Sequence, residues 1–356
     1  MTRVDALKDA ARSGAGAVLL TSPVARRYAT GFNASAGVVL VTGGEGFFIT
    51  DFRYIESARA QVKGFTVLLS TRENTALKQV AEILKTRGIT QVGYEADTVT
   101  AEALEKLNKE LEVSLIPAQE RIHALRLNKS ADEVAAIKAA QRIAERALKE
   151  VIEGVLRPGI TERQLCAEII YRIHLYGADG VSFPPIVVSG PNSSLPHGEP
   201  GDRVLRRGDC VTIDIGAQKD GYCSDMTRTY VLGEASDEVR RVYDTVLRAQ
   251  LSGIAAVRAG KTGAQIDEAA RSVIRDAGYG EFFGHGFGHG VGLEVHERPT
   301  LSPGKDDPLT PGAVITAEPG IYLPGKFGVR IEDLLLVTED GCENLTEMTK
   351  ELTVIE

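Results

Sequence analysis

Three of the six histidines in the chain lie in one glycine-rich run, Gly284 to Glu297. They are His285, His289 and His296. Glycines at alternate positions make a poor strand, because they offer no side chains to pack against neighbouring strands. They do let the backbone come close to a ligand or ion, and they leave the imidazoles free to reach it. The run therefore favours a metal or substrate site over a flexible loop that carries histidines by chance.

Acidic residues flank a predicted hairpin turn at Asp220-Gly221, with a strand-like run on either side of the turn. Asp214 and Asp225 are equally far from a turn centre placed between Lys219 and Asp220. If the hairpin is regular, these two carboxylates lie directly opposite each other on one face of it.

A second predicted hairpin repeats this arrangement. Its turn is centred on Gly325, and Glu318 and Glu332 are symmetric about that residue. Carboxylates that face each other across two strands repel and destabilise the sheet. Two such pairs in apolar strands therefore require a shared countercharge.

The four carboxylates and the imidazole of His289 form a hard, oxygen-rich ligand set. Such a set suits Mn²⁺, Co²⁺ or Zn²⁺, and two ions would use it fully. A carboxyl pair with a raised pKa and no metal is the alternative. The nitrogen ligand that His289 would supply favours the metal centre.

A weak internal repeat divides the C-terminal region into two halves, each of which contains a single hairpin of this kind. Arg, Gly, Thr and Gln recur 101 residues apart in two segments that begin at Arg157 and Arg258. Gly177 and Gly278 keep the same spacing. Each Thr-x-x-Gln can cap the start of a helix. We therefore expect two related halves, each with a helix, a glycine turn, a capped helix and strands, and a site between the halves.

Residues 1 to about 127 alternate strand-like and helix-like segments and contain no recognisable catalytic cluster. We interpret the polar segment Asp51-Phe52-Arg53-Tyr54 as a strand-to-helix corner. Strand-like runs cover residues 18–21, 38–42, 46–51, 65–70, 91–95 and 113–116, and helical patterns cover residues 52–61, 73–87 and 99–110. Residues 42–46 have the composition of a hairpin turn.

The boundary between the N-terminal and C-terminal regions is marked by a capping box, in which Ser130 is followed by Glu133 at the start of a helical pattern. We place the boundary near Asn128. The prediction is an α/β (α+β) protein with a first domain in residues 1–127 and a second in residues 128–356.

Composition narrows the partners and the compartment. The 356 residues are 43% hydrophobic and 25% charged, as in ordinary globular proteins. The net charge of −8 argues against nucleic acid or an anionic membrane as the main partner. The four cysteines form no CxxC pair, and the N-terminus shows no secretory pattern. We expect a cytoplasmic protein with reduced thiols.

Five motifs in order between residues 190 and 337 carry a family resemblance. They are Leu195-Pro196-His197-Gly198 with Asp214, Ser224-Asp225-Met226-Thr227-Arg228-Thr229, the run from His285 to Glu297, Ala317-Glu318-Pro319-Gly320, and Val329-Arg330-Ile331-Glu332-Asp333. Together they resemble the proline-specific branch of the pita-bread metallopeptidases, which contains Xaa-Pro aminopeptidase and Xaa-Pro dipeptidase (prolidase). Residues 1–127 resemble the creatinase-like N-terminal domain of that branch. The resemblance implies that a pseudo-two-fold pita-bread catalytic domain follows this domain.

The resemblance also implies the metal ligands, and these are Asp214, Asp225, His289, Glu318 and Glu332. Asp225 and Glu332 would bridge two divalent ions, with Mn²⁺ as the first choice and Co²⁺ or Zn²⁺ as alternatives. Asp214 would hold one ion, and His289 with Glu318 would hold the other. A hydroxide between the ions would be the nucleophile, and Glu318 would also act as general base.

The remaining implied roles concern catalysis and substrate binding. Glu318 would be joined in catalysis by His197, which handles a proton or orients a carbonyl, by His296 and by Arg330. Arg330 lies two residues before Glu332, hence on the same strand face, and could pair with a ligating carboxylate or with the substrate. The substrate-binding residues would be His285, His296 and Tyr222.

Within this branch, prolidases typically carry an arginine shortly after the His-Glu-x-Pro motif, where it binds the carboxylate of a dipeptide. Thr300 stands at that position here, and a buried carboxylate without a cationic partner is costly. We therefore expect an Xaa-Pro aminopeptidase acting on peptides with proline second, with Xaa-Pro dipeptidase as the alternative. A catalytically inactive binding module is the competing class. The resemblance further implies a homodimer.

Overall fold

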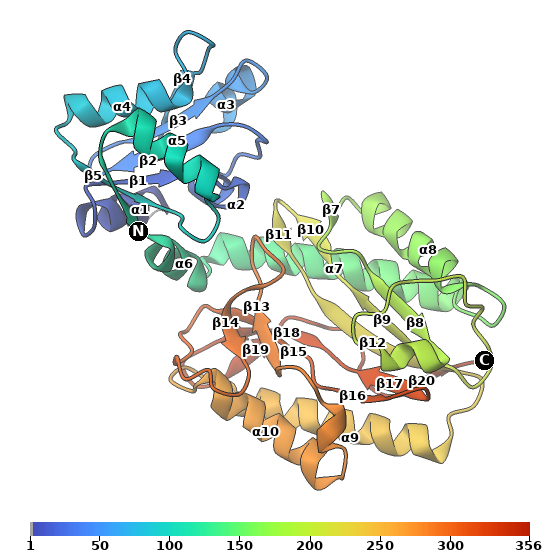
Figure 1. Cartoon of the computed structure of the whole chain (residues 1–356). Coiled ribbons are helices and arrows are strands. Elements are labelled where there is room, and N and C mark those ends of the chain that lie inside the picture. The colour runs from blue at the N-terminus through green and yellow to red at the C-terminus, as the bar shows by residue number, and fades with distance from the viewer. Residues whose placement is uncertain (1–2) are drawn as a thin grey trace. The chain divides into compact units, whose positions relative to one another are not determined.

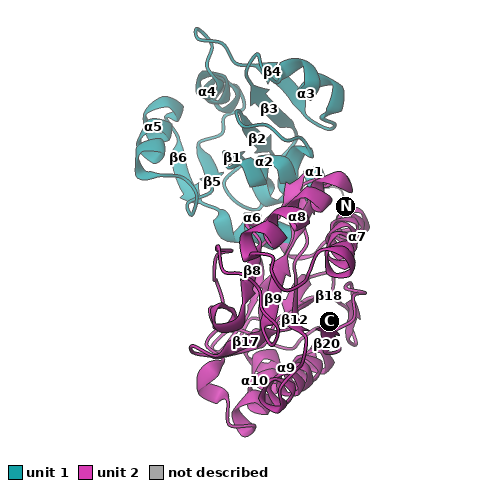
Figure 2. Cartoon of the chain, turned by 90° about the vertical axis from the view of Figure 1, so that its right-hand side faces the viewer, with its two compact units in different colours: residues 1–126 teal, residues 127–356 magenta. Residues whose placement is uncertain are grey.

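The computed structural model describes residues 3–356. The chain divides into two compact units, one ending at Arg126 and one beginning at Leu127, and Figure 2 colours them separately. Both units combine helices with sheets, so the α/β fold class is confirmed. Among the described residues, no helix has both the length and the apolar character needed to cross a membrane.

The first unit is built on a six-stranded sheet with the order β4-β3-β2-β1-β5-β6. Each of the six predicted strands is present, and β2 and β3 form the expected hairpin, in which Val41 pairs with Gly46. The strands are β1 (Ala17–Leu20), β2 (Val38–Thr42), β3 (Gly46–Thr50), β4 (Thr66–Leu69), β5 (Gln91–Tyr94) and β6 (Ser114–Pro117).

The helices of this unit were only partly predicted. The structure has α3 (Ile55–Gln61) and α4 (Ala76–Thr86) within the expected ranges, and α5 (Ala101–Leu111) extends one residue beyond its expected range. It adds α1 (Arg3–Arg12), α2 (Pro23–Thr30) and α6 (Gln119–Leu127), which the periodicity did not reveal. Helix α2 has 8 residues, or about two turns. Its capping residue Ser22 and the following Pro23 could have indicated the start of this helix.

Residues 127–356, all of which the structure describes, form the second unit. Its helices are α7 (Ala131–Gly154), α8 (Glu162–Leu175), α9 (Asp237–Ala256) and α10 (Gly263–Asp276), with short 3₁₀ turns η1 (Gly190–Ser194) and η2 (Gly280–Phe282). Figure 1 shows α7 and α8 on one side of the strands and α9 and α10 on the other.

Two larger sheets carry most of the strands around the site. One has the order β20-β12-β9-β8 and the other β14-β13-β15-β18-β19. Their strands are β8 (Ile186–Ser189), β9 (Cys210–Ile215), β12 (Met226–Leu232), β13 (Gly288–Gly290), β14 (Glu297–Leu301), β15 (Val314–Ala317), β18 (Asp333–Val337), β19 (Cys342–Asn344) and β20 (Thr353–Ile355). Smaller sheets contain β7 (Gly180–Val181), β10 (Ala217–Lys219) and β11 (Tyr222–Cys223), and β16 (Gly320–Leu323) with β17 (Phe327–Arg330).

The expected internal repeat is visible in helices α8 and α10. Thr161 caps α8 and Thr262 caps α10, and a glutamine at the third helical position completes a capping box in both. Each helix is 14 residues long and is followed by a glycine with positive φ, Gly177 or Gly278. The capping box of Ser130 and Glu133 is also confirmed, at the start of α7.

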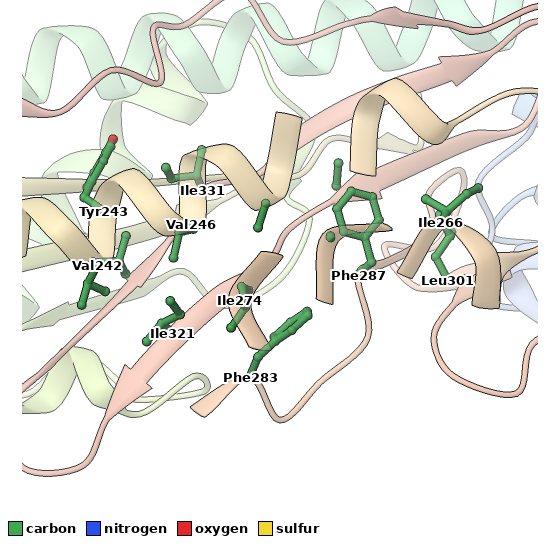
Figure 3. Packing of buried hydrophobic residues seen from close by; sticks show 14 of the residues in the cluster. Val242, Tyr243, Val246, Ile266, Ile274, Phe283, Phe287, Leu301, Ile321 and Ile331 are labelled. Carbon is green, nitrogen blue, oxygen red and sulfur yellow. The ribbon is translucent and has the colours of Figure 1, made fainter. Parts of the chain in front are cut away.

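Each half packs around its own apolar cluster, one on α7 and α8 and one on α9 and α10. Figure 3 shows Phe287 inside the second cluster, near Ile266 and Leu301. A Cβ at Gly253 would lie 2.3 Å from the Phe287 ring, so this segment of α9 requires glycine. Because Phe287 lies between His285 and His289, its burial anchors the backbone of the histidine run.

Candidate metal centre

The second unit contains a cavity of about 1200 Å³. All five residues expected to bind metal contribute to its wall, and so do four of the five other residues expected at the site. The first group is Asp214, Asp225, His289, Glu318 and Glu332, and the second is His197, His285, His296 and Arg330. Tertiary structure thus brings together side chains from both halves of the repeat.

The first hairpin corrects our expectation for Asp214. It pairs with Thr227, not with Asp225. The turn residues Asp220 and Gly221 both have positive φ, 50° and 83°, which is typical of a two-residue turn centred between them. This centre lies one residue further along than we assumed. Asp225 is two residues from Thr227, so it lies diagonally across from Asp214 on the same face.

The second hairpin has the expected register. Ala317 pairs with Asp333, and beyond a break Gly320 pairs with Arg330. Glu318 and Glu332 therefore occupy facing positions in the break between these two ladders. The Glu332 N–H donates to the Thr227 carbonyl at 3.1 Å, which ties this hairpin to the first one.

His289 lies among the carboxylates. Its Nε2 is 3.2 Å from Glu318 Oε1 and 3.7 Å from Asp225 Oδ2. Asp225, His289 and Glu332 each offer a ligand atom, and these atoms all lie within 4.8 Å of one another. Two carboxylates and one imidazole at such separations can share one divalent cation.

The electrostatics of the cluster fit a site for cations. Burial and repulsion by neighbouring acids raise the pKa of Asp225 and Glu332 well above the ordinary values, and burial raises the pKa of Asp214. Burial acts to raise the pKa of Glu318 too, but the hydrogen bond and charge of His289 lower it to about 2. Asp214 Oδ1 and Asp225 Oδ1 are buried and accept no hydrogen bond from the described residues. Divalent cations would neutralise the repulsion and coordinate these two oxygens, so the residues present fit such ions.

Arg330 pairs with one of the acids, as the strand alternation predicted. Its guanidinium donates to Asp214 Oδ2 at 2.7 Å and to the Tyr322 hydroxyl at 2.8 Å. It also donates to Thr227 Oγ1 at 3.1 Å and to the Pro196 carbonyl at 3.2 Å. With these four contacts, Arg330 fixes the Asp214 carboxylate and connects it to the segment before His197.

Three polar residues at the site were missed. The hydroxyl of Thr227 donates to Glu332 Oε2 at 2.7 Å, and that of Thr316 donates to Glu318 Oε1 at 3.1 Å. Each threonine lies two residues from an acid of the cluster, so strand alternation was a usable signal. Tyr322 bonds to His285 Nε2 at 2.9 Å as well as to Arg330, and burial raises its pKa to about 12. No local pattern marked Tyr322.

Tyr222 does not belong to this site. Its buried hydroxyl donates to Glu133 Oε1 on α7 at 2.7 Å, and among the described residues it is absent from the cavity wall. Tyr222 precedes Asp225 by three residues, an odd number, so along an extended strand its side chain lies on the opposite face. We therefore withdraw Tyr222 from the substrate-binding residues.

The other histidines of the site face the same cavity. His197 and His296 are exposed within it. The ring of His296 meets that of His289 edge to face, with centroids 4.3 Å apart. Burial lowers the pKa of His285 and of His296, which favours the neutral imidazole in both. Neutral imidazoles can accept or donate a hydrogen bond next to a bound peptide.

Comparison with known proteins yields two family matches. Residues 135–339 match metallopeptidase family M24, and residues 3–128 match the creatinase/prolidase N-terminal domain. An Xaa-Pro dipeptidase from Pyrococcus furiosus is 36% identical, with 94% of each chain covered. The structure of an Xaa-Pro dipeptidase from Bacillus anthracis superposes with a TM-score of 0.95 at 41% identity, covering 99% of both chains. That of an X-Pro aminopeptidase from Thermotoga maritima gives a TM-score of 0.92 at 37% identity, covering 98% of this chain and 100% of the other.

Proposed function

The chain belongs to metallopeptidase family M24. We propose that it hydrolyses the peptide bond between an N-terminal residue and a following proline, and that Xaa-Pro dipeptides are its preferred substrates. The main observation in favour of a metal-dependent peptidase is a cluster of four acids, three of them buried, and one imidazole in a cavity large enough for a peptide. The match to this family and the pita-bread fold agree with the expectation from the five motifs.

The preference for dipeptides rests on similarity. Relatives that are 36% and 41% identical over nearly the whole chain carry the name Xaa-Pro dipeptidase. These names support our sequence-based alternative better than the aminopeptidase that we expected from Thr300. Xaa-Pro aminopeptidase is the second candidate, because Thr300 lines the cavity with a hydroxyl and brings no positive charge for a terminal carboxylate. The cavity volume of about 1200 Å³ also leaves room for a longer peptide.

We assign the site residues as follows. Asp214, Asp225, His289, Glu318 and Glu332 would hold two divalent cations, with Mn²⁺ as our first choice. When bound, such ions lower the pKa of water and stabilise negative charge on the substrate carbonyl. Glu318 accepts the proton of the attacking water, and the Thr316 hydroxyl orients this carboxylate. Arg330 orients the Asp214 carboxylate, and its positive charge opposes the rise in the pKa of Asp214 that burial causes. His197 and His296 contact the peptide on the open side of the cavity.

Substrate length separates the two candidate activities. With Mn²⁺ bound, we expect kcat/KM for Ala-Pro to exceed that for Ala-Pro-Ala at least tenfold, or about 1.4 kcal/mol. Both peptides share the scissile bond, so the comparison isolates recognition of the C-terminal side. Ala-Ala serves as the control for proline specificity. A preference for the tripeptide would establish the aminopeptidase and remove the dipeptidase proposal.

His197 provides a second test, because it is at the cavity but outside the proposed ligand set. We expect His197→Ala to lower kcat by about 100-fold, the lower end of what a positioned proton-transfer group contributes. The metal content should match that of the wild type. His174→Ala on the exposed face of α8 is the matched control, and it should leave kcat unchanged. Metal loss in the His197 variant would show that His197 is a ligand instead.

Two further expectations remain proposals. We propose that the functional domains are residues 1–127 and 128–356, and that the protein is a homodimer. Analytical ultracentrifugation of the full chain gives the oligomeric state directly, and a single monomer peak at micromolar concentration would exclude the dimer.

A further inference from the structure

Each half of the second unit contains a buried carboxylate that holds the loop carrying a site histidine, and we infer that Glu162 and Asp267 are positioning residues for the reaction. Both lie near the N-termini of the two related helices, α8 and α10. Their relative exposures are 0% and 1%. The inference rests on the proposed function, because it concerns the histidines and acids of that site.

Glu162 is the first residue of α8, and its carboxylate faces the loop after β8. Oε1 accepts from the Ser189 N–H at 2.7 Å and from the Ser189 hydroxyl at 2.8 Å. Oε2 accepts from the Gly201 N–H at 3.1 Å. The Asn192 amide reaches both oxygens, at 3.2 and 3.3 Å. One side chain therefore holds both ends of the loop from residue 189 to residue 201.

His197 lies inside this loop and faces the cavity. The carbonyl of the preceding Pro196 accepts from Arg330, and the ends of the loop are held by Glu162. Two charged groups that do not touch the imidazole thus restrain the backbone of the loop that carries His197. Neither of them needs to contact the substrate for this effect.

Asp267, at a different position on α10, holds the histidine segment of the second half. Its Oδ1 accepts from the Phe287 N–H at 2.9 Å. Arg271 bonds both Asp267 oxygens, at 2.7 and 2.9 Å, and donates to the carbonyls of Phe283 and His285 at 2.9 and 2.6 Å. The pair therefore binds the backbone at residues 283, 285 and 287, directly before His289.

The two contacts lead to different regions of the site. The Phe287 carbonyl accepts from the Glu318 N–H at 2.8 Å. Asp267 is therefore linked through Phe287 to Glu318, a proposed metal ligand. Phe287 also lies two residues before His289, a second proposed ligand. The hydrogen bonds of the Glu162 carboxylate go to the loop of His197. Burying a carboxylate is costly unless charge-assisted hydrogen bonds compensate it, and here those bonds go to the histidine loops.

The experiment compares Glu162→Gln and Asp267→Asn in the full chain. Each amide keeps the size of the side chain but turns one accepting oxygen into a donor that faces an N–H or a guanidinium. The matched controls are Glu168→Gln on α8 and Glu268→Gln on α10, where the side chains are 45% and 57% exposed. Mn²⁺ affinity is measured by calorimetry on protein freed of metal, and kcat and KM are measured on Ala-Pro.

For Asp267→Asn we expect Mn²⁺ affinity to fall about 10- to 100-fold, as is typical when a group behind a metal ligand is changed. Activity should recover at saturating Mn²⁺. For Glu162→Gln we expect unchanged Mn²⁺ affinity and a kcat lowered by about 10- to 100-fold with little change in KM. The controls should match the wild type in all three quantities.

A lower melting temperature with unchanged Mn²⁺ affinity and kcat would overturn the inference, because both acids would then serve only the fold. If Asp267→Asn does not fold, Arg271→Lys, which removes the contacts to Phe283 and His285, replaces it in the affinity measurement. A wild-type chain that binds Mn²⁺ but hydrolyses no Xaa-Pro peptide would end the proposed function. The affinity comparison between the variants at Asp267 and Glu268 would still decide the role of Asp267.

Discussion

Replacing Asp225 by asparagine is expected to lower kcat/KM for Ala-Pro by about 1000-fold or more, which corresponds to about 4 kcal/mol of transition-state stabilisation. The amide has one oxygen acceptor and no charge, so it could not take the bridging role that we propose for the Asp225 carboxylate. Asp225 is buried, and its Oδ1 has no hydrogen-bond donor among the described residues. We expect bound Mn²⁺ to fall with activity, as measured by elemental analysis.

The same variant should fold at least as well as the wild type when both are free of metal. Burial, and then the charges of Glu332, Asp214 and Glu318, raise the pKa of Asp225, which means that an ionised Asp225 is repelled by its neighbours. A neutral amide of the same shape removes this repulsion. We therefore expect an equal or higher melting temperature in the metal-free state.

Asp220→Asn is the matched control. Asp220 lies in the exposed turn of the same hairpin with φ 50°, a conformation that asparagine also adopts readily. Activity and metal content should not change in this variant. Near-normal activity in Asp225→Asn would remove Asp225 from the centre and with it the bridging role.

Removal of metal by a chelator is expected to abolish hydrolysis, and titration with Mn²⁺ should restore it with a stoichiometry of two ions per chain. The ions bind the folded chain, so they should also raise its melting temperature. At free Mn²⁺ about 1000-fold above the dissociation constant, each bound ion adds about 4 kcal/mol to the free energy of unfolding.

Calorimetry and elemental analysis of the same samples give the stoichiometry independently of activity. Asp225→Asn is the built-in control, because it should bind fewer ions under the same conditions. Less than one ion bound per chain at saturating Mn²⁺ or Co²⁺ would favour the alternative of an inactive binding module. Full activity in the presence of the chelator would support a carboxyl pair that acts without metal.

Much of the fold could be predicted from the sequence because helix caps and strand patterns depend on residues that are close together in the chain. Capping boxes depend on residues three apart, and those at Ser130, Thr161 and Thr262 mark the starts of α7, α8 and α10. The spacing between the last two also revealed the repeat. Helices α1 and α2 were missed although both are longer than α3, which has 7 residues and was predicted, so length alone does not explain the omission.

The acids and histidines of the site could be chosen from the sequence because glycines and paired carboxylates are unusual within strands, and because strand alternation links residues two apart. That alternation places Arg330, Thr227 and Thr316 on the same strand faces as acids of the site, and Thr316 donates to the acid two residues away, Glu318. It could not show which acid Arg330 meets. Asp214 is 116 residues away, on a different hairpin.

Register and long-range contact were decided only by the tertiary structure. A shift of one residue in the centre of the Asp220-Gly221 turn moved Asp214 from Asp225 to Thr227, and turn conformation depends on backbone angles that composition only constrains. The same holds for Tyr322, which reaches His285 across a break between sheets, and for Tyr222, which faces α7. The sequence by itself determined which groups have the chemistry, since that depends on residue type. Packing of the two halves determined which of them meet, because those contacts join segments that only the folded chain brings within bonding distance.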